Sequence, residues 1–277
     1  MKARSPGRSG MIRERNQVSV AGLANGQPIV FVHGFGCDKS MWKQVTPAFE
    51  TTHRVITYDL TGMGSSDLTA YDPARYQDLQ AHADDLLKIL DDLDLSNAIL
   101  VGHSIGATIA LLAANRAPDR VARLVFVSPS PSFLDDPEAG YRGGFSREDM
   151  LELITFLDEN HLGWSAQMAP TLTGAPAGAP ASEDLTQSFC RTDPTIAQHF
   201  GRTTFFADQR AAFTGAVRPA LILHCDNDAL VPMQVAEWMR DHVPGAQLTV
   251  LHAHGHCPHM TVPADVVGAM RDFLEAG

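Results

Sequence analysis

The chain alternates short, nearly continuous apolar runs with longer segments in which apolar residues recur at helical spacing. A continuous apolar run indicates a strand that is buried on both faces, as in a parallel sheet covered by helices. The helical spacing is clearest in residues 79–93, 105–116 and 263–274. The expected strands span residues 29–33, 54–58, 98–103, 123–128, 220–225 and 248–252. Strands that alternate with helices in this way predict a mostly parallel, doubly wound α/β sheet.

Residues 132–205 interrupt this alternation, because they contain no convincing strand. The insertion falls between two sheet strands, near the end of the sheet where folds of this kind bind ligands. It therefore predicts a helical lid over a binding site; an ordinary helical excursion without a gating role is the alternative. The expected helical segments are residues 146–161, 163–172, 183–190 and 194–205. The expected domains are a mobile tail of residues 1–12, a core of residues 13–131 and 206–277, and a lid of residues 132–205.

Composition argues against several classes of protein. Hydrophobic residues make up 44 % of the 277 residues and charged residues 19 %, so the chain can bury a full core rather than remain disordered. The net charge of −11 argues against a nucleic-acid or acidic-membrane surface, because both need basic patches. No apolar run approaches the roughly 20 residues of a membrane span, and no apolar stretch follows the basic N-terminus as in a secretory signal.

The cysteines are scattered and form no CxxC pair. In a chain of this length, that pattern predicts free thiols in a reducing compartment. We therefore expect a cytoplasmic protein without disulfides. The four cysteines are Cys37, Cys190, Cys225 and Cys257.

The sequence GHSIG at residues 102–106 places Ser104 between an expected strand and an expected helix. This is the context of a nucleophile elbow, whose small residues allow a sharp turn at the carboxyl end of the sheet. We therefore predict that Ser104 is the nucleophile of a serine hydrolase with an α/β-hydrolase fold. A helix cap would also explain a lone serine here, but not the acid and base described next. A serine at this position argues against haloalkane dehalogenases and epoxide hydrolases, which carry an aspartate.

The acid is expected after the strand at residues 220–225, because the order along an α/β-hydrolase chain is serine, acid, histidine. Two aspartates, Asp226 and Asp228, follow that strand. Asp228 stands four residues before Pro232, in the D-x-x-x-P pattern common after this strand, whereas Asp226 suits a turn. We predict that Asp228 holds the imidazole tautomer and stabilises the imidazolium.

His256 is the expected base, because a Gly-His pair stands in the loop before the final helix. A serine hydroxyl is a weak nucleophile at neutral pH and needs such a base. The neighbouring His252, His254 and His259 are expected to form loop hydrogen bonds. The run HAHGHCPH also resembles a metal-binding stretch. It holds no carboxylate, and its central glycine favours a loop, so no metal or other cofactor is predicted.

Acyl transfer also needs N–H donors for the oxyanion. We expect these to be the amide of Ile105, directly after the nucleophile, and the amide of Phe35, in the loop after the first long strand. Gly34 and Gly36 allow that loop to turn back over the site. The loop lacks the G-x-G-x-x-G and Gly-Lys-Ser/Thr patterns of nucleotide-binding sites, so a nucleotide site is not expected.

Several stretches resemble a family of bacterial stress-regulatory hydrolases, the RsbQ type. They extend over nearly the whole chain from about residue 13, the lid included. The same patterns are similar to the plant strigolactone and karrikin receptors, which share the fold, but GFGCDKSMW and GHCPHM resemble the RsbQ type more closely. The stretches are FVHGFGCDKSMW, YDLTGMGSSDL, VGHSIGA, SPSFLDD, GGF, ADQR and GHCPHM.

This resemblance implies a triad of Ser104, Asp228 and His256, and oxyanion amides at Phe35 and Ile105. It also implies a V-shaped lid of four helices over a pocket lined with aromatic and aliphatic side chains. Met168 stands where the receptors often have an aromatic residue, and a methionine makes that wall more adaptable. Outside Phe35, ordinary core packing is the alternative role for the pocket positions. The matching positions are Phe35, Phe133, Phe145, Trp164, Met168 and Phe205.

Two functions from different classes fit these features. In the first, the protein is an enzyme that hydrolyses a small hydrophobic ester, lactone or enol ether through an acyl-enzyme. In the second, it is a sensor that binds or slowly hydrolyses a small molecule, after which its lid engages a protein partner. The RsbQ resemblance implies that this partner is a PAS-domain phosphatase of the PP2C type in a stress response.

Overall fold

The computed structural model describes residues 11–276, in which seven strands form one sheet with the order β1-β3-β2-β4-β5-β6-β7. Neighbouring strands run parallel, except that β1 pairs antiparallel with β3. Six strands are β2 Gln27–Val32, β3 His53–Thr57, β4 Ala98–His103, β5 Val121–Val127, β6 Ala220–Asn227 and β7 Ala246–His254. These six confirm the predicted strands with small shifts at their ends. The edge strand β1 Ser19–Gly22 was not expected, because its four residues are exposed and form no apolar run.

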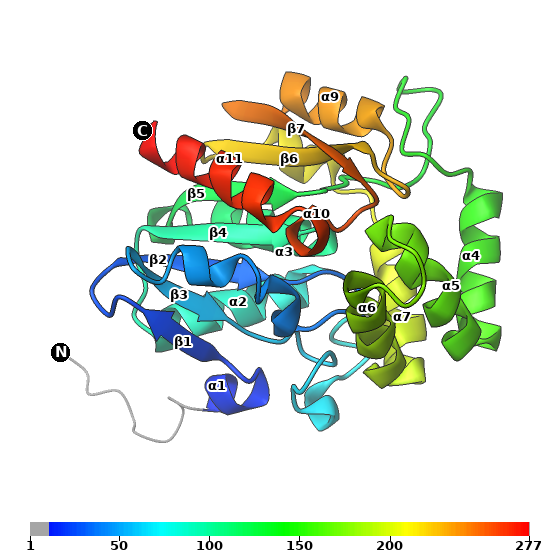
Figure 1. Ribbon diagram of the computed structural model, residues 1–277, viewed down its shortest axis with the longest axis horizontal. Helices are drawn as coiled ribbons and strands as arrows, with labels where there is room; N and C mark the ends of the chain where they lie inside the picture. Colours follow the sequence, from blue (N-terminus) through cyan, green and yellow to red (C-terminus); the bar gives the residue numbers. More distant parts are fainter. Residues whose placement is uncertain (1–10, 277) are drawn as a thin grey trace.

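Helices cover both faces of the sheet (Figure 1). One face of the sheet carries α2, α3, α8 and α9, each of which contacts the next. The other face carries α10 and α11. Their bounds are α2 Gln80–Asp92, α3 Ile105–Arg116, α8 Arg210–Thr214, α9 Met233–His242, α10 Pro258–Thr261 and α11 Pro263–Glu275. Short 3₁₀ turns span Lys39–Trp42, Thr46–Ala48, Leu68–Ala70 and Pro118–Arg120. Within residues 11–276, no helix has the length and apolarity that a bilayer crossing would need.

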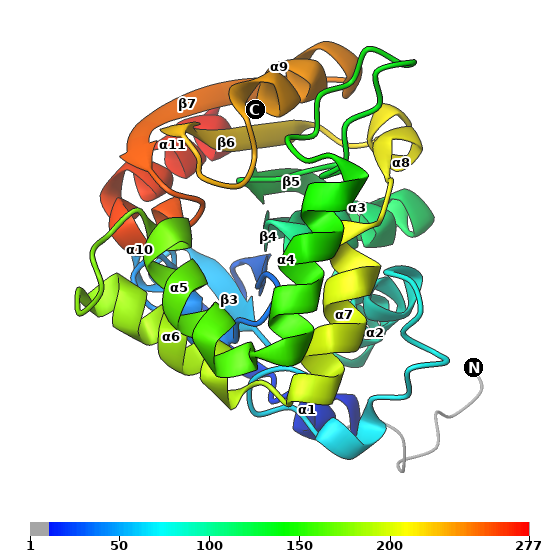
Figure 2. The ribbon, with the colours of Figure 1, turned by 90° about the vertical axis from the view of Figure 1, so that its right-hand side faces the viewer.

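Four helices are inserted between β5 and β6, as the break in alternation predicts. Figure 2 shows them side by side, with the sheet behind them. Polar caps start three of them: Ser146 forms a capping box with Asp149 before α4, and Asn160 and Asp193 cap α5 and α7. The inserted helices are α4 Arg147–Glu159, α5 His161–Thr173, α6 Pro180–Arg191 and α7 Pro194–Phe205. We call these four helices the lid; the domain limits expected from the sequence stay predictions.

Most of the expected N-terminal tail lies outside the described residues, which begin at Met11. The last two residues of that tail, Met11 and Ile12, form the start of helix α1 Met11–Arg15. The side chain of Ile12 is buried in the core. These two residues of the expected tail are therefore helical, and one of them packs on the core.

The centre of the core is the crossing of β4, β2 and α3. All six residues of β4 are buried, and so are ten of the twelve residues of α3. Gly106 makes this close approach possible, because a Cβ atom there would lie 2.5 Å from the carbonyl oxygens of Val32 and His33. The α3 helix is rich in small residues for the same reason: larger side chains would lift it off the sheet.

We predict that Gly106→Ala destabilises the protein by about 1–3 kcal/mol, the usual cost of overpacking a core, because the added methyl meets backbone atoms that cannot turn aside. The matched control is Gly268→Ala in α11, where a Cβ atom meets nothing within 4 Å. Removing a mid-helix glycine there should leave stability equal or raise it by up to about 1 kcal/mol. Urea unfolding of both variants measures the difference, and equal midpoints would contradict the packing argument.

Candidate active site

Ser104 sits on a sharp turn between β4 and α3. Its backbone has φ 52° and ψ −122°, a conformation that a residue with a side chain adopts only under strain. The turn is held by a hydrogen bond of 2.9 Å from the Ser104 amide to the Val127 carbonyl. Gly102 leaves room for it, since a Cβ atom there would lie 2.3 Å from the Gly106 carbonyl oxygen. The two glycines of GHSIG are therefore explained by contact between backbones, and the turn is the elbow that the sequence predicts.

Asp228 and His256 are brought together from β6 and β7. His256 Nδ1 lies 2.9 Å from Asp228 Oδ2 and 3.1 Å from Oδ1, and both side chains are almost entirely buried. Asp228 Oδ1 also accepts hydrogen bonds from the amides of Leu230 and Val231, at 2.8 and 3.0 Å. Burial alone would raise the pKa of Asp228, but the facing imidazole and these amides outweigh burial and lower the pKa below its usual value. Asp228 is thus an ionised carboxylate that orients one nitrogen of the imidazole.

Asp226 is placed differently from Asp228. Its side chain is about half exposed, and its Oδ2 pairs with Nδ1 of the exposed His252 at 2.8 Å. Its other oxygen accepts from the Ala253 amide at 3.2 Å, so Asp226 links the ends of β6 and β7 at the surface. Between the two candidate acids, only Asp228 reaches His256.

The second ring nitrogen of His256, Nε2, is buried and has no hydrogen-bond partner among the described residues. His256 and Ser104 both line one cavity, which gives this nitrogen and the serine hydroxyl a shared space. No hydrogen bond joins Ser104 to His256 within residues 11–276. Such bonds are often long or poorly aligned before substrate binds. The arrangement leaves one basic nitrogen free beside a strained serine.

The remaining histidines of the HAHGHCPH run lie in separate environments. His252 pairs with Asp226, and His254 Nδ1 accepts from the Asn227 side chain at 2.6 Å. His259 does not form the expected loop hydrogen bond: it is fully buried, with its ring 4.6 Å from Trp42, and neither ring nitrogen has a partner in the part of the chain described. Burial lowers the pKa of His259 to about 3, so its ring is neutral. The histidines therefore do not converge on a common point.

His103, next to the serine, contacts the loop of His256, a role that the sequence did not single out. Its Nε2 donates to the carbonyl oxygen of His256 at 2.9 Å, which ties the serine turn to the loop of the imidazole. Burial, and then the neighbouring His259 and His256, lower the pKa of His103 well below its usual value, so the ring is neutral. The only sequence signal for this role is its position inside GHSIG.

The amides of Phe35 and Ile105 are both available as donors. No hydrogen bond is made by either N–H group within residues 11–276. Ile105 is the first residue of α3, where the helix has unpaired amides that favour negative charge. Phe35 lies in a turn that is closed by a hydrogen bond of 3.3 Å from the Cys37 amide to the Gly34 carbonyl. Gly36, with φ 64°, supplies the left-handed residue that this turn needs.

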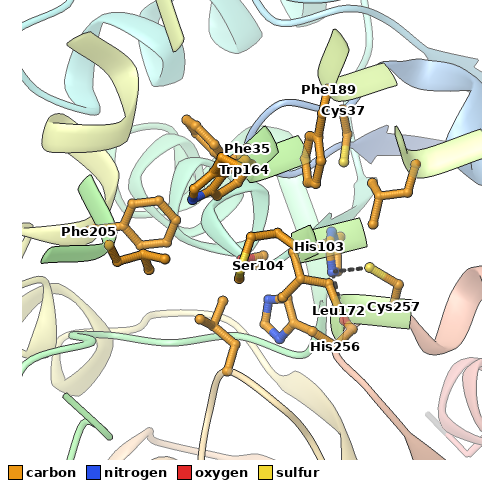
Figure 3. Close-up of a pocket in the computed structure, with 14 residues that line it drawn as sticks. Phe35, Cys37, His103, Ser104, Trp164, Leu172, Phe189, Phe205, His256 and Cys257 are labelled. Atoms are coloured by element: carbon orange, nitrogen blue, oxygen red, sulfur yellow. Dashed lines mark hydrogen bonds between the residues drawn. The ribbon is translucent and has the colours of Figure 1, made fainter. Parts of the chain in front are cut away.

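A small cavity lies between Ser104 and the lid. Figure 3 shows the side chains of Phe35, Trp164 and Phe205 around the same space as Ser104 and His256. None of the lining residues is Asp, Glu, Lys or Arg. Trp164 Nε1 is buried without a partner in the described chain. The lining residues are Phe35, Cys37, His103, Ser104, Leu153, Trp164, Met168, Leu172, Leu185, Phe189, Phe205, Leu230, His256 and Cys257.

Two of the six residues expected to bind substrate, Phe133 and Phe145, do not line this cavity. Phe133 is buried behind Phe205, with the two rings 5.2 Å apart, so it supports the wall without forming it. Phe145 lies outside the cavity, and its backbone amide donates a hydrogen bond to the Phe133 carbonyl. The other four expected residues, Phe35, Trp164, Met168 and Phe205, do line it. The sequence missed Phe189 and the leucines, because an apolar residue on a lid helix does not reveal which side it faces.

Known proteins are similar to this chain over most of its length. The model of the family described as "Alpha/beta hydrolase family" matches residues 29–269. The chain is 36 % identical to a strigolactone esterase of Pisum sativum, over 85 % of this chain and 88 % of that protein. It is 31 % identical to a karrikin insensitive 2 receptor of Petunia hybrida, over 93 % and 94 % of the two chains. The structure of a hydrolase from Oleispira antarctica superposes with a TM-score of 0.92 at 36 % identity, covering 96 % of this chain and 97 % of the other.

We predict that Met168→Trp fills the cavity and weakens binding of the neutral fluorescent probe N-phenyl-1-naphthylamine by about tenfold or more, which is about 1.4 kcal/mol. The larger ring would occupy the space next to Ser104. Fluorescence titration measures the affinity. The matched control Phe145→Leu changes a half-buried residue outside the cavity and should bind the probe as the unchanged protein does. Equal affinities for both variants would show that the probe binds elsewhere.

Proposed function

Because the chain belongs to the alpha/beta hydrolase family, we propose that it hydrolyses a small, uncharged, hydrophobic ester, lactone or enol ether through an acyl-enzyme on Ser104. One observation carries this proposal: the buried imidazole of His256 is held by Asp228 on one side and keeps its other nitrogen free in the cavity of Ser104. The apolar lining of that cavity supports a neutral, hydrophobic substrate.

In the proposed reaction, His256 Nε2 takes the hydroxyl proton of Ser104 as Oγ attacks the substrate carbonyl. The negative charge that forms on the carbonyl oxygen would be stabilised by the free amides of Phe35 and Ile105. Collapse of the tetrahedral intermediate breaks the bond to the leaving group, which takes the proton back from His256. Water then repeats the sequence on the acyl-enzyme, releasing the acid and restoring Ser104.

The role of Asp228 follows from its burial and charge. An ionised carboxylate beside Nδ1 fixes the tautomer that leaves Nε2 free to accept a proton. It also stabilises the imidazolium that forms during each proton transfer. Because the pKa of Asp228 is lowered, its carboxylate stays ionised throughout the neutral pH range.

A sensor function is the second candidate. It is favoured by the sequence identity of 31 % to a plant receptor over 93 % of this chain. The same triad would then act slowly or once, and the closed lid would report occupancy to a protein partner. Turnover separates the two: a rate on the order of 10 s⁻¹ on the natural substrate is typical of an enzyme. The RsbQ type, the phosphatase partner and the cytoplasmic location stay predictions.

We predict that Ser104→Ala lowers the rate of p-nitrophenyl butyrate hydrolysis by about 10³-fold or more, because the acyl-accepting oxygen is lost. Initial rates from p-nitrophenolate absorbance measure the effect. The variant should still bind N-phenyl-1-naphthylamine, which shows that the cavity remains intact. A variant that keeps a rate near that of the unchanged protein would refute Ser104 as the nucleophile.

We also predict that Asp228→Asn lowers kcat by about 10²-fold or more, because an amide at this position favours the wrong imidazole tautomer. Asp226→Asn is the matched control and should leave kcat nearly unchanged, since its side chain bonds to His252 and the Ala253 amide and not to His256. Steady-state kinetics on the same ester compare the two variants. If both lose activity equally, Asp228 does not have the role assigned to it.

A further inference from the structure

The loop with the Phe35 amide is in direct contact with lid helix α6. Ser188 Oγ lies 3.0 Å from the carbonyl oxygen of Gly36 and 3.3 Å from Asp38 Oδ2, so its proton can be donated to either. Arg191 Nη2 donates to the same Asp38 oxygen at 2.7 Å. Phe189 packs over the loop, since a Cβ atom on Gly36 would lie 2.4 Å from the Phe189 ring. One turn of the lid therefore holds the residues directly after Phe35.

These contacts are suited to fixing the loop in one position. Ser188 and Asp38 are both buried, and residues three apart such as Ser188 and Arg191 share one face of a helix. Asp38 also caps the following 3₁₀ turn by accepting from the Ser40 amide at 2.8 Å. Arg191 is about half exposed, so its ion pair alone contributes little stability. Its effect is to orient a buried carboxylate that already belongs to the loop.

The lid also touches the loop of His256, from a different helix. The His256 amide donates to the carbonyl oxygen of Leu172, near the end of α5, at 2.5 Å. The backbones approach closely there, because a Cβ atom on Gly255 would lie 2.5 Å from the Thr173 carbonyl carbon. The lid thus contacts both loops that the proposed reaction uses, in addition to closing the cavity.

We infer that Ser188 and Arg191 are positioning residues, through which lid helix α6 sets the place of the Phe35 amide in the oxyanion hole. The inference rests on the proposed function. An oxyanion donor acts only when it lies within hydrogen-bond distance of the developing charge, and a misplacement of about 1 Å can reduce a rate by as much as 10²-fold. A lid that moves away from Gly36 and Asp38 would release the turn around Phe35. The position of the lid then controls the chemical step as well as access to the cavity.

The test compares the double variant Ser188→Ala/Arg191→Leu with the unchanged protein. We expect kcat on p-nitrophenyl butyrate to fall by about tenfold or more, with KM within about twofold, because the transition state loses a donor that the substrate does not need. The affinity for phenylboronic acid, which forms a tetrahedral adduct on a nucleophilic serine, should fall in parallel with kcat. The affinity for N-phenyl-1-naphthylamine should not change. The conservative variant Ser188→Thr/Arg191→Lys should recover most of the lost rate.

A matched control uses residues whose bonds stay inside the lid. Thr186 Oγ1 donates within α6 to the Ser182 carbonyl, and Arg202 pairs with Asp158 between α7 and α4. Thr186→Val/Arg202→Leu removes a hydroxyl and a guanidinium from the same lid without touching the Phe35 loop. We expect both kcat and the boronic acid affinity to be retained.

Three results would overturn the inference: an unchanged kcat in the Ser188/Arg191 variant, an equal loss in the lid-internal control, or equal losses of boronic acid and naphthylamine affinity. The last would mark general damage to the cavity. Failure of the proposed function is separate, because it would appear as hydrolysis that survives Ser104→Ala.

Discussion

The close contact between β4 and the start of α3 determines most of the site. Gly102 brings β4 against the start of α3, and Gly106 brings α3 against the end of β2, until backbone meets backbone. Ser104, between the two glycines, is left with a positive φ. That strain costs of order 1–3 kcal/mol and persists only because the buried strand and helix on either side cannot relax it. The place of the buried Ser104 side chain in the cavity wall and the free amide of Ile105 both follow from this turn. A looser crossing would remove both the elbow and the amide proposed as an oxyanion donor.

The sheet then determines which acidic residue reaches the imidazole. Strands β6 and β7 run parallel, so the chain beyond each of them arrives at the same edge, near Ser104. Asp226 is still within β6 and faces the surface, whereas Asp228 lies past its end and turns inward to two backbone amides. A carboxylate buried to this extent needs hydrogen bonds in place of its water, and a facing positive charge stabilises it further. The site supplies the amides permanently and the positive charge only when His256 is protonated.

The sequence was sufficient for these elements because each has a local signal. The apolar runs predicted β2 to β7. They did not predict β1, because its four exposed residues form no apolar run. Asp228 stood out because it follows a strand and precedes Pro232 by four residues. His256 stood out because it follows a glycine in the loop before the final helix. The cavity wall was harder, since Phe133 and Phe189 are both buried aromatics and only packing decides that Phe189 lines the cavity. The contacts of Ser188 and Arg191 with the Phe35 loop join residues about 150 positions apart, and no local pattern encodes them.

The cavity that results treats substrate and product unequally. Its walls carry no side chain of Asp, Glu, Lys or Arg. A neutral ester can therefore enter without the desolvation cost that a charged molecule would have. The proposed hydrolysis would then create a carboxylate in the same space, with His256 between it and the ionised Asp228. An unpaired charge in an apolar site is costly, and a like charge nearby adds to the cost. The two amides proposed as oxyanion donors would offset part of this cost for the short-lived intermediate, but less for a carboxylate that has left the serine. Under the proposed function, the electrostatics that favour a neutral substrate would therefore also favour release of the acid, and one property of the cavity wall would set both substrate preference and turnover.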